Sequence, residues 1–240
     1  MENIDNKTVA EIVTENIKTA DVFKKNGIDF CCGGHVSVQE VCAKKGIDYA
    51  SLKEEILKIG TQQQGSHDFN TWDLDFLSDY IINTHHRYVQ EASLIIAQYA
   101  EKVAKVHGHH YIETIEINKL FIEIANELSS HMQKEEGILF PYIKELAAAK
   151  KKGEKIPTPH FGTIQNPIRM MEEEHTGAGE ILFKIKDLTK DFNPPSGACN
   201  TFRALYAKLE EFQNDLFQHI HLENNILFPK AIALEAEMLN

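Results

Sequence analysis

The sequence predicts an all-α protein whose larger part is an antiparallel four-helix bundle. Apolar residues recur at helical spacing through long segments, whereas the alternation of apolar and polar residues that is typical of strands is rare. The pattern H-x3-E-x2-ILFP begins at His131 and again at His219, with a period of 88 residues. A repeat of that length suits a pair of long helices with their connections, and two such hairpins make a four-helix bundle.

The composition favours a compact protein that does not bind nucleic acid. The 240 residues include 25 Lys and Arg against 36 Asp and Glu, a net charge of -11. Nucleic acids and anionic membranes bind cationic patches, so neither is expected as a partner. No apolar run reaches the roughly 18 residues of a membrane span, and the N-terminus lacks the basic start and apolar run of a signal peptide. The expected location is therefore the cytoplasm.

Residues 1–60 are expected to form a small helical domain. Short amphipathic patterns run through it, interrupted by the sequence CCGG, and the first of them has apolar residues at helical spacing: Val9, Ile12, Val13, Ile17 and Phe23. The polar stretch TQQQGSHDFN, residues 61–70, lacks such periodicity and is predicted to be a linker. Residues 71–240 are then expected to form the bundle.

Four long helices are predicted in the bundle, over residues 72 to about 106, 114–150, 164–188 and 201–235. The loops KKKGEKIPTPHFG and NPPSGACN, which contain prolines, separate the last three. Each ILFP segment is expected to pack in the core, with its proline kinking or ending the helix.

Histidines and glutamates repeat together with these helices. His86 lies 45 residues before His131, and His175 lies 44 residues before His219. Each hairpin therefore carries one histidine on its first helix and an H-x3-E pair on its second. Residues four apart share a helix face, so imidazole and carboxylate can both point into the bundle. The predicted metal ligands are His86, His131, Glu135, His175, His219 and Glu223.

The chemistry of these six side chains suits a pair of metal ions. Imidazole nitrogens and carboxylate oxygens favour iron or manganese, and a glutamate can bridge two ions. If Glu135 and Glu223 both bridge, each metal receives two histidines and two carboxylate oxygens, with room for a solvent-derived bridge and an open position. Ferritin-like proteins use Glu-x-x-His pairs instead, a spacing that is absent around these histidines. A lone H-x3-E is usually a surface pair, so the repetition is what indicates metal binding.

His85 is the one alternative to a predicted ligand. It precedes His86, and adjacent helix positions point about 100° apart, so only one of the two can face the metals. The 45-residue spacing favours His86, but whether His85 replaces or joins it stays open. No metal role is expected for histidines in predicted loops, at helix ends or off the ligand face, namely His67, His107, His109, His110, His160 and His221.

The four cysteines are expected to be free thiols, because they do not form the dense framework of a small secreted domain. Cys31 and Cys32 allow two interpretations. They are small packing residues beside a glycine turn, or they lie near a helix N-terminus, whose dipole lowers the thiol pKa. In the second case they would be redox or transfer thiols that accept a nitrosyl group or hold iron. No function is expected for Cys42 or Cys199.

Four segments together resemble the repair-of-iron-centres (RIC) proteins of the ScdA, YtfE and DnrN type: DFCCGG, HMQKEEGILFP, EEEHTGAGEI and HIHLENNILFP. The resemblance spans nearly the whole chain. It implies a hemerythrin-like bundle preceded by a ScdA-type N-terminal domain, and a non-haem di-iron centre with an oxo or hydroxo bridge on the same six residues. RIC proteins are implicated in restoring iron-sulfur clusters damaged by nitric oxide or oxidants, and activity towards nitric oxide is also discussed for them.

The leading hypothesis is therefore a di-iron protein that repairs iron-sulfur clusters under nitrosative or oxidative stress, by iron donation or nitric oxide removal. Its partners would be damaged iron-sulfur proteins, with nitric oxide or oxygen as small ligands. Whether it acts as an enzyme and whether it forms a homodimer are left open. The alternative is a di-iron sensor or carrier of oxygen or nitric oxide. Oxygen-carrying hemerythrins use five histidines, and one histidine fewer favours a labile or reactive site. Iron storage is disfavoured because nothing indicates a cage-forming shell.

Overall fold

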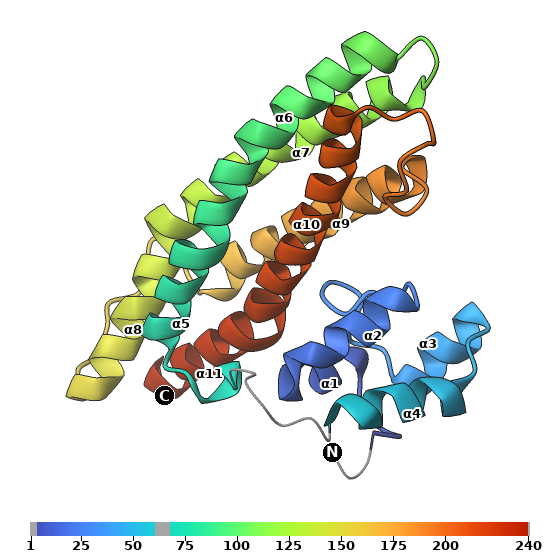
Figure 1. Ribbon diagram of the computed structural model, residues 1–240. Helices are drawn as coiled ribbons and strands as arrows, with labels where there is room; N and C mark the ends of the chain where they lie inside the picture. The colour runs from blue at the N-terminus through green and yellow to red at the C-terminus, as the bar shows by residue number, and fades with distance from the viewer. Residues whose placement is uncertain (1–3, 61–67, 240) are drawn as a thin grey trace.

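The computed structural model describes residues 4–60 and 68–239. Within these residues the regular elements are helices, and the one pairing of extended backbone is an isolated bridge between Thr8 and Ser37. Figure 1 shows a small N-terminal unit lying beside a long helical bundle. The prediction of an all-α fold is confirmed.

The N-terminal unit contains four short helices: α1 (Val9–Glu15), α2 (Ala20–Lys25), α3 (Val38–Lys45) and α4 (Tyr49–Gly60). Thr8 and Ser37 begin α1 and α3 with capping boxes, in which each hydroxyl accepts from the backbone N–H three residues on. Residues 26–37 join α2 to α3 and carry the cysteine pair. This loop faces the bundle, where the ring of Phe30 meets that of Phe217 edge-on, 6.2 Å away.

The bundle consists of four long helices, three of them interrupted by a π turn. The first comprises α5 (Leu74–Ile81), a π turn (Ile82–His86) and α6 (Arg87–His107). The second comprises α7 (Glu113–Lys134), a π turn (Glu135–Leu139) and α8 (Phe140–Lys152). The third is α9 (Gln165–Leu188), and the fourth comprises α10 (Asn200–Leu222), a π turn (Glu223–Leu227) and α11 (Phe228–Leu239). The bundle closes because α6 packs on α7 and α10, and α9 packs on α7 and α10.

Each π turn begins or ends at a predicted ligand residue. The N–H of Phe140 donates to the carbonyl of Glu135, and the N–H of Phe228 donates to that of Glu223, which is one residue further back than in an α-helix. Pro141 follows the first of these turns, and the helix continues beyond it as α8. The helical chain thus continues through the ILFP prolines. Of the two outcomes expected for them, a kink or the end of the helix, the end of the helix is wrong. The wider turn places the proline in the first turn of the next segment, where its missing N–H is tolerated.

Two apolar clusters fill the molecule, with the ligand residues between them. One combines the N-terminal unit with residues of α6, α7, α10 and the second half of α9, and the other combines α5, α8, α11 and the start of α9. Along the second long helix, Leu128 belongs to the first cluster and Leu139 to the second, and His131 and Glu135 lie between them. The polar layer is therefore enclosed by packed apolar side chains on both sides.

The predicted linker lies mostly outside the described residues. At its end, Phe69–Thr71 forms a 3-10 turn, and Phe69 is buried against the rings of Trp72 and Tyr80. The predicted boundaries, with the N-terminal domain ending at residue 60 and the bundle beginning at residue 71, stay a prediction.

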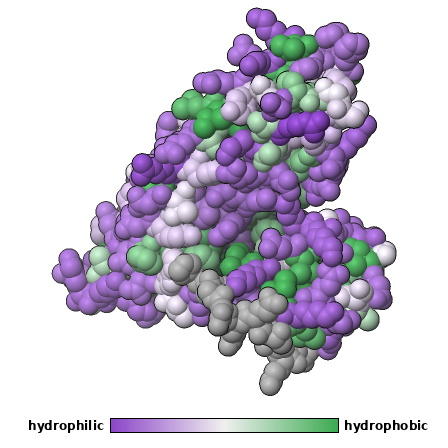
Figure 2. Space-filling view, viewed as in Figure 1, coloured by the Kyte–Doolittle hydropathy of each residue, from purple (hydrophilic) through white to green (hydrophobic). Residues whose placement is uncertain are grey.

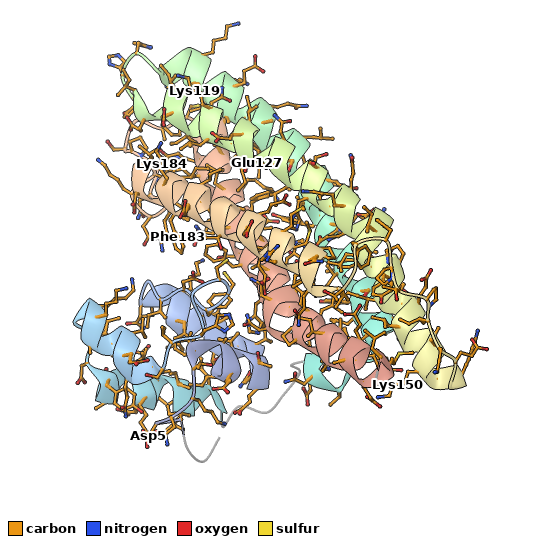
Figure 3. All side chains as sticks on the ribbon, turned by 180° about the vertical axis from the view of Figure 1, so that it is seen from behind. Asp5, Lys119, Glu127, Lys150, Phe183 and Lys184 are labelled. Atoms are coloured by element: carbon orange, nitrogen blue, oxygen red, sulfur yellow. The ribbon has the colours of Figure 1, made fainter. Side chains whose placement is uncertain are left out.

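The face of the molecule drawn in Figure 2 is mostly hydrophilic, and its hydrophobic side chains are scattered in small areas. Figure 3, seen from behind, shows α9 between α7 and the N-terminal unit, an arrangement that places the cysteine loop next to the middle of the bundle. None of the described helices is long and apolar enough to cross a membrane.

Candidate metal centre

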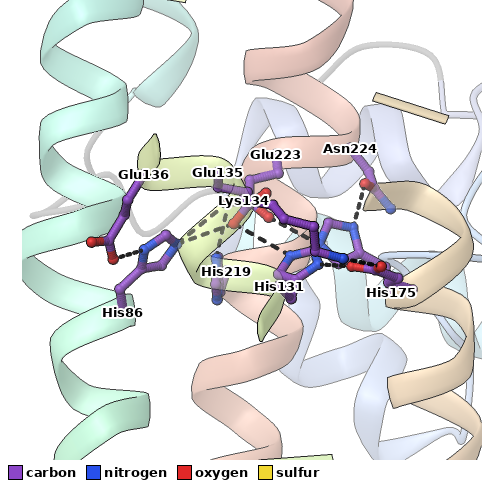
Figure 4. Close-up of polar contacts among 10 residues, drawn as sticks. His86, His131, Lys134, Glu135, Glu136, His175, His219, Glu223 and Asn224 are labelled. Atoms are coloured by element: carbon purple, nitrogen blue, oxygen red, sulfur yellow. Dashed lines mark hydrogen bonds and ion pairs between the residues drawn. The ribbon is translucent and has the colours of Figure 1, made fainter. Parts of the chain in front are cut away.

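The six predicted ligand residues converge in the middle of the bundle (Figure 4). They come from all four long helices, and each of the six is exposed by 2 % or less. Each hairpin contributes three of them. In the second and fourth long helices a π turn begins at the glutamate of the H-x3-E pair, and this wider turn changes the rotation of the helix around its axis.

The six residues form two overlapping groups, in each of which one ligand atom per residue lies within 4.8 Å of all the others. Both glutamates belong to both groups, whereas each histidine belongs to one. The arrangement thus offers two metal positions, each with two imidazoles and two carboxylates. The first group is His86, Glu135, His219 and Glu223. The second group is His131, Glu135, His175 and Glu223.

The glutamates lie between histidines of the two groups. Glu135 Oε2 lies 3.3 Å from Nε2 of His86 and 3.3 Å from Nε2 of His131, which belong to different groups. Glu223 Oε1 lies 3.0 Å from Nε2 of His219. Every imidazole therefore presents Nε2 to the centre, and Glu135 reaches towards both metal positions.

The Nδ1 atoms face outward, and most of them have a partner that fixes the ring. Such partners set the tautomer and orientation of a metal-binding histidine and raise its basicity. Among the described residues, Nδ1 of His219 has no hydrogen-bond partner. The other three Nδ1 atoms each lie 2.8 Å from a side-chain oxygen. The partner is Glu136 for His86, Glu174 for His131 and Asn224 for His175.

Unsatisfied polar atoms show that this site fits a metal. In the described part of the chain, Nε2 of His86, both carboxylate oxygens of Glu135 and Oε2 of Glu223 are buried without a hydrogen-bond partner. Their close contacts with one another lack the angles of hydrogen bonds. Leaving one such atom unsatisfied costs about 1–3 kcal/mol, and more when it is charged. Two cations at the centre of the six side chains would satisfy these atoms together, and the nitrogen and oxygen donors suit iron or manganese.

Comparison with known proteins agrees with this geometry. The sequence matches the family described as Hemerythrin HHE cation binding domain over residues 78–231, which include all six residues of the centre. The chain belongs to the hemerythrin HHE family. Residues 5–59 match a second family, ScdA_N, described as a domain of unknown function. A cation-binding domain implies a metal site, and the two groups of histidines and glutamates are the residues that could form it.

Curated relatives cover nearly the whole chain. The iron-sulfur cluster repair protein ScdA of Staphylococcus haemolyticus is 35% identical over 222 residues, which are 92% of this chain and 96% of the relative. The iron-sulfur cluster repair protein YtfE of Yersinia pestis is 34% identical over 227 residues, 95% of this chain and 97% of the relative. The protein of the same name from Yersinia pseudotuberculosis matches to the same extent. The resemblance to RIC proteins is confirmed.

Without a metal, the charges of this hemerythrin-type site balance through protons. Burial lowers the pKa of His86, but the carboxylates of Glu135 and Glu223 outweigh it and raise that pKa to about 10. Burial likewise lowers the pKa of His131, and Glu135 with its other acidic neighbours raises it to about 9. Burial raises the pKa of Glu223, but His219 and the other imidazoles hold it well below its usual range. Metal binding must therefore release protons from the imidazoles, so that cations replace them.

His85 lies beside the hemerythrin-type centre but belongs to neither group. Its Nδ1 is 3.0 Å from Asp215 Oδ1, and its ring stacks on that of His219 with centroids 5.6 Å apart and planes 11° apart. Of the two neighbouring histidines, the fold therefore brings His86 to the centre and packs His85 behind His219.

Sequence reasoning missed the partners of the Nδ1 atoms. Glu136 and Asn224 lie outside the H-x3-E pattern, and Glu174 directly precedes the predicted ligand His175. One signal was present, because Glu136 and Asn224 each follow the glutamate of the H-x3-E pair and so occupy the same position in the repeat. Glu174 also pairs with Lys134, and both line a surface pocket of about 330 Å³ between α7 and α9 that reaches His131. His175 also lines this pocket.

The cysteine loop does not lie at a helix N-terminus, contrary to one of the two interpretations. Helix α3 begins only at Val38, after the cap at Ser37. Cys31 is buried and Cys32 is half-buried. The neighbouring Cys32 thiol, burial and Asp29 all raise the pKa of Cys31 well above its usual range. The expected activation by a helix dipole is therefore wrong, and the Cys31 thiol is protonated unless a cation lies next to it.

The loop nevertheless contacts the hemerythrin-type bundle at its centre. Cys32 Sγ lies 3.6 Å from the backbone carbonyl oxygen of His175, and Asn225 Nδ2 donates to the carbonyl of Cys31 at 3.3 Å. Asn225 is in the π turn that begins at Glu223. His221, expected to lie off the ligand face, is buried at the same contact, with Nε2 3.4 Å from Oγ1 of Thr14.

Proposed function

We propose that this chain is a di-iron protein that repairs iron-sulfur clusters damaged by nitrosative or oxidative stress, by donating iron or by removing nitric oxide. One observation carries the proposal, namely the two overlapping groups that share both buried glutamates. The relatives named as iron-sulfur cluster repair proteins support it, and they favour it over a sensor or carrier of oxygen or nitric oxide.

In this proposal each residue of the centre has a distinct role. His86 and His219 would hold one iron ion, His131 and His175 would hold the other, and Glu135 and Glu223 would bind both. Bound iron would supply a Lewis-acidic and redox-active position for a small ligand. The protein supplies the orientation of the rings through their Nδ1 partners and excludes water through the apolar clusters above and below the ligand layer.

The donor set supports release of iron as well as binding. Four histidines and two carboxylates leave coordination positions that protein atoms do not fill. We propose that the surface pocket lined by His131 and His175 is the path between one metal position and solvent. A site that must give up its ion needs both features.

We further propose that Cys31 and Cys32 take part as redox or transfer thiols. Cys32 Sγ lies 3.6 Å from the backbone carbonyl oxygen of His175, and the two sulfur atoms are 3.8 Å apart, which supports this role because His175 is a ligand residue of one group. All four cysteines are free, which supports a cytoplasmic location, where thiols stay reduced. The proposed partners are damaged iron-sulfur proteins, with nitric oxide or oxygen as small ligands.

Metal analysis of the purified protein tests the first part of this proposal. We expect about two iron ions per chain, because six ligands with two bridging carboxylates complete two sites. A single zinc ion per chain after expression in iron-replete medium would contradict it.

An iron-transfer assay tests the second part of the proposal, the repair of damaged clusters. Iron should pass from the loaded protein to a cluster protein damaged by nitric oxide, with recovery of the cluster absorption. A chelator should extract the iron rapidly under reducing conditions. Slow extraction without recovery of the cluster would instead support the sensor or carrier.

A further inference from the structure

A third set of possible ligand atoms lies outside the hemerythrin-type centre. Among the described residues, Asp29, Cys31 and Cys32 each offer one ligand atom within 4.8 Å of the other two. The two sulfur atoms are 3.8 Å apart, and Cys31 Sγ lies 3.2 Å from Asp29 Oδ1. Neither the curated names nor the family descriptions assign a role to this set.

The loop holds the Asp29 carboxylate in a fixed position facing the sulfurs. Asp29 Oδ1 accepts from the backbone N–H of Cys31 at 2.9 Å and of Cys32 at 3.1 Å, and Oδ2 accepts from Gly33 at 2.9 Å. A side chain at Gly34 could not be accommodated, because its Cβ would lie 2.6 Å from the carbonyl oxygen of Phe30. A carboxylate has about four acceptor positions, two on each oxygen. Oδ1 therefore uses both of its positions for backbone bonds and is also approached by the Cys31 thiol, whereas Oδ2 keeps one position beside its bond from Gly33.

We propose that Asp29, Cys31 and Cys32 form a second metal site, which holds a single ferrous ion in transit between the di-iron centre and a recipient protein. Two thiolates and a carboxylate suit a borderline divalent ion such as Fe²⁺. Three protein ligands leave one of the four positions of a tetrahedral ion open, as in sites that exchange their fourth ligand. A ligand of the recipient can take that position. This inference rests on the proposed function, because it names the route of the donated iron.

The position of the loop supports a route from one of the two metal positions. Cys32 Sγ lies 3.6 Å from the carbonyl oxygen of His175 and 3.9 Å from where a Cβ of Gly179 would be, so the thiol packs against α9. Asn225, two residues after Glu223, holds the carbonyl of Cys31. The loop thus rests on two elements, α9 and the last π turn, that supply ligands to the same group.

The transfer is an exchange of ligands without a change of oxidation state. Bonds from Fe²⁺ to imidazole nitrogens and glutamate oxygens break, and bonds to two sulfurs and one Asp29 oxygen form. The two thiols lose two protons to water as they bind. When the ion moves to the recipient's ligands, the thiolates take two protons back.

Cobalt gives a direct test, because thiolate coordination to Co²⁺ produces charge-transfer absorption. The iron-loaded, reduced, full-length protein is titrated with Co²⁺ without oxygen. The six residues of the centre offer only nitrogen and oxygen, so this absorption reports cysteine coordination alone. We expect it to saturate at about one Co²⁺ per chain.

Variants assign the absorption to the proposed ligands. Cys32→Ser, at the half-buried position, should abolish it, and Cys31→Ala should do the same without placing a hydroxyl in the core. Asp29→Asn should weaken Co²⁺ binding, because it removes the charge. Cys42→Ser/Cys199→Ser, which alters the other two thiols, should leave the absorption unchanged. Helical circular dichroism and iron content verify that each variant is folded.

The outcomes separate this inference from the proposed function. If the protein carries about two irons and restores damaged clusters but shows no thiolate absorption with Co²⁺, the inference is overturned and the proposed function stands. Absorption that survives in folded Cys32→Ser and Cys31→Ala proteins would also overturn it. If the centre carries no iron, the proposed function itself fails. Loss of both the absorption and the cluster recovery in Cys32→Ser, with iron retained in the centre, would support the transit site.

Discussion

At the scale of single residues, the two glutamates of the centre are the most demanding feature of the chain. Burying a carboxylate in an apolar interior is expensive unless cations or hydrogen bonds compensate it. Glu135 and Glu223 are both fully buried and lie side by side between the histidines. Such a pair is better explained by a bound cation than by a contribution to folding, since one of the two could otherwise be replaced by an apolar residue with a gain in stability.

Glutamine at Glu135 or at Glu223 should therefore remove most of the bound metal, because a neutral amide bridges two cations poorly. Metal analysis of the purified variants measures the loss. Glu136→Gln should have a smaller effect, weakening metal affinity about 10- to 100-fold without changing the stoichiometry, because Glu136 only orients His86.

Glu123 supplies the matched control for this series, because it is exposed on α7, the helix that leads to Glu135. Glu123→Gln should leave metal content and affinity unchanged. The same loss of metal in Glu123→Gln and Glu135→Gln would show that the effect arises from net charge rather than from the site.

Alanine at His86 should remove metal, whereas alanine at His85 should leave it bound. His85→Ala should instead lower the free energy of unfolding by about 1–3 kcal/mol, because it leaves Asp215 without its partner. Metal analysis and urea denaturation of both variants distinguish the two effects. Metal loss in His85→Ala with unchanged metal in His86→Ala would reverse the assignment of these neighbours.

Spacing along the sequence was sufficient to select the six residues that the fold brings together. The positions repeat between the hairpins, and four-residue spacing places two side chains on one face of any helix. Their outer partners were not predictable in the same way. Whether Glu136 faces His86 depends on the π turn that starts at Glu135, and Glu174 reaches His131 from a different helix. Such contacts depend on packing between helices, which one sequence does not define.

At the scale of helices, the ends of the long segments were predicted closely, whereas the π turns were not. Apolar periodicity located the second helix at 114–150, and it spans Glu113–Lys152 including its π turn. A π turn inserts a single residue into a helix, which shifts the apolar pattern by one position and leaves little trace in a window of 11–18 residues. Each ILFP proline was expected to kink or end the helix, whereas it lies in the first turn of the next helical segment.

The ILFP prolines should consequently be nearly neutral for stability. Pro141→Ala should change the free energy of unfolding by less than about 1 kcal/mol, because Pro141 lies in the first turn of α8, where an N–H is not needed. Ala148→Pro, at an exposed position in the interior of α8, should cost about 3 kcal/mol or more. Urea denaturation of both proteins tests this. A loss of several kcal/mol in Pro141→Ala would mean that the proline itself maintains the π turn.

At the scale of the whole molecule, the N-terminal unit and the bundle share a hydrophobic cluster. Side chains of both belong to it, including Phe30 from the cysteine loop and Phe217 from α10. The sequence indicated two parts from the change in helix length and the polar stretch between them. It contained no signal for the contact, because Phe217 and His221 occupy ordinary positions of an amphipathic helix.

The bundle alone, residues 71–240, should fold and bind both metal ions, because it contains all six ligand residues and the second apolar cluster. It should be less stable than the full chain by about 2 kcal/mol or more, since removal of the N-terminal unit exposes Phe217 and its neighbours. Circular dichroism and metal analysis of the fragment measure these properties. A fragment that folds but holds no metal would show that the N-terminal unit completes the site.

The repeat also makes the two metal positions counterparts of one another. His86 in the first hairpin corresponds to His175 in the second, and these histidines belong to different groups. The residues behind them differ, because Glu136 accepts from one ring and Asn224 from the other. A carboxylate makes an imidazole a stronger electron donor than an amide does. Each group nevertheless contains one ring with a carboxylate partner, His86 in one and His131 in the other, so two ions in this centre would differ through their second histidines. Nδ1 of His175 has an amide partner, whereas Nδ1 of His219 has none among the described residues, so the ion at His131 and His175 would receive more electron density and the two ions would load, reduce and leave one after the other.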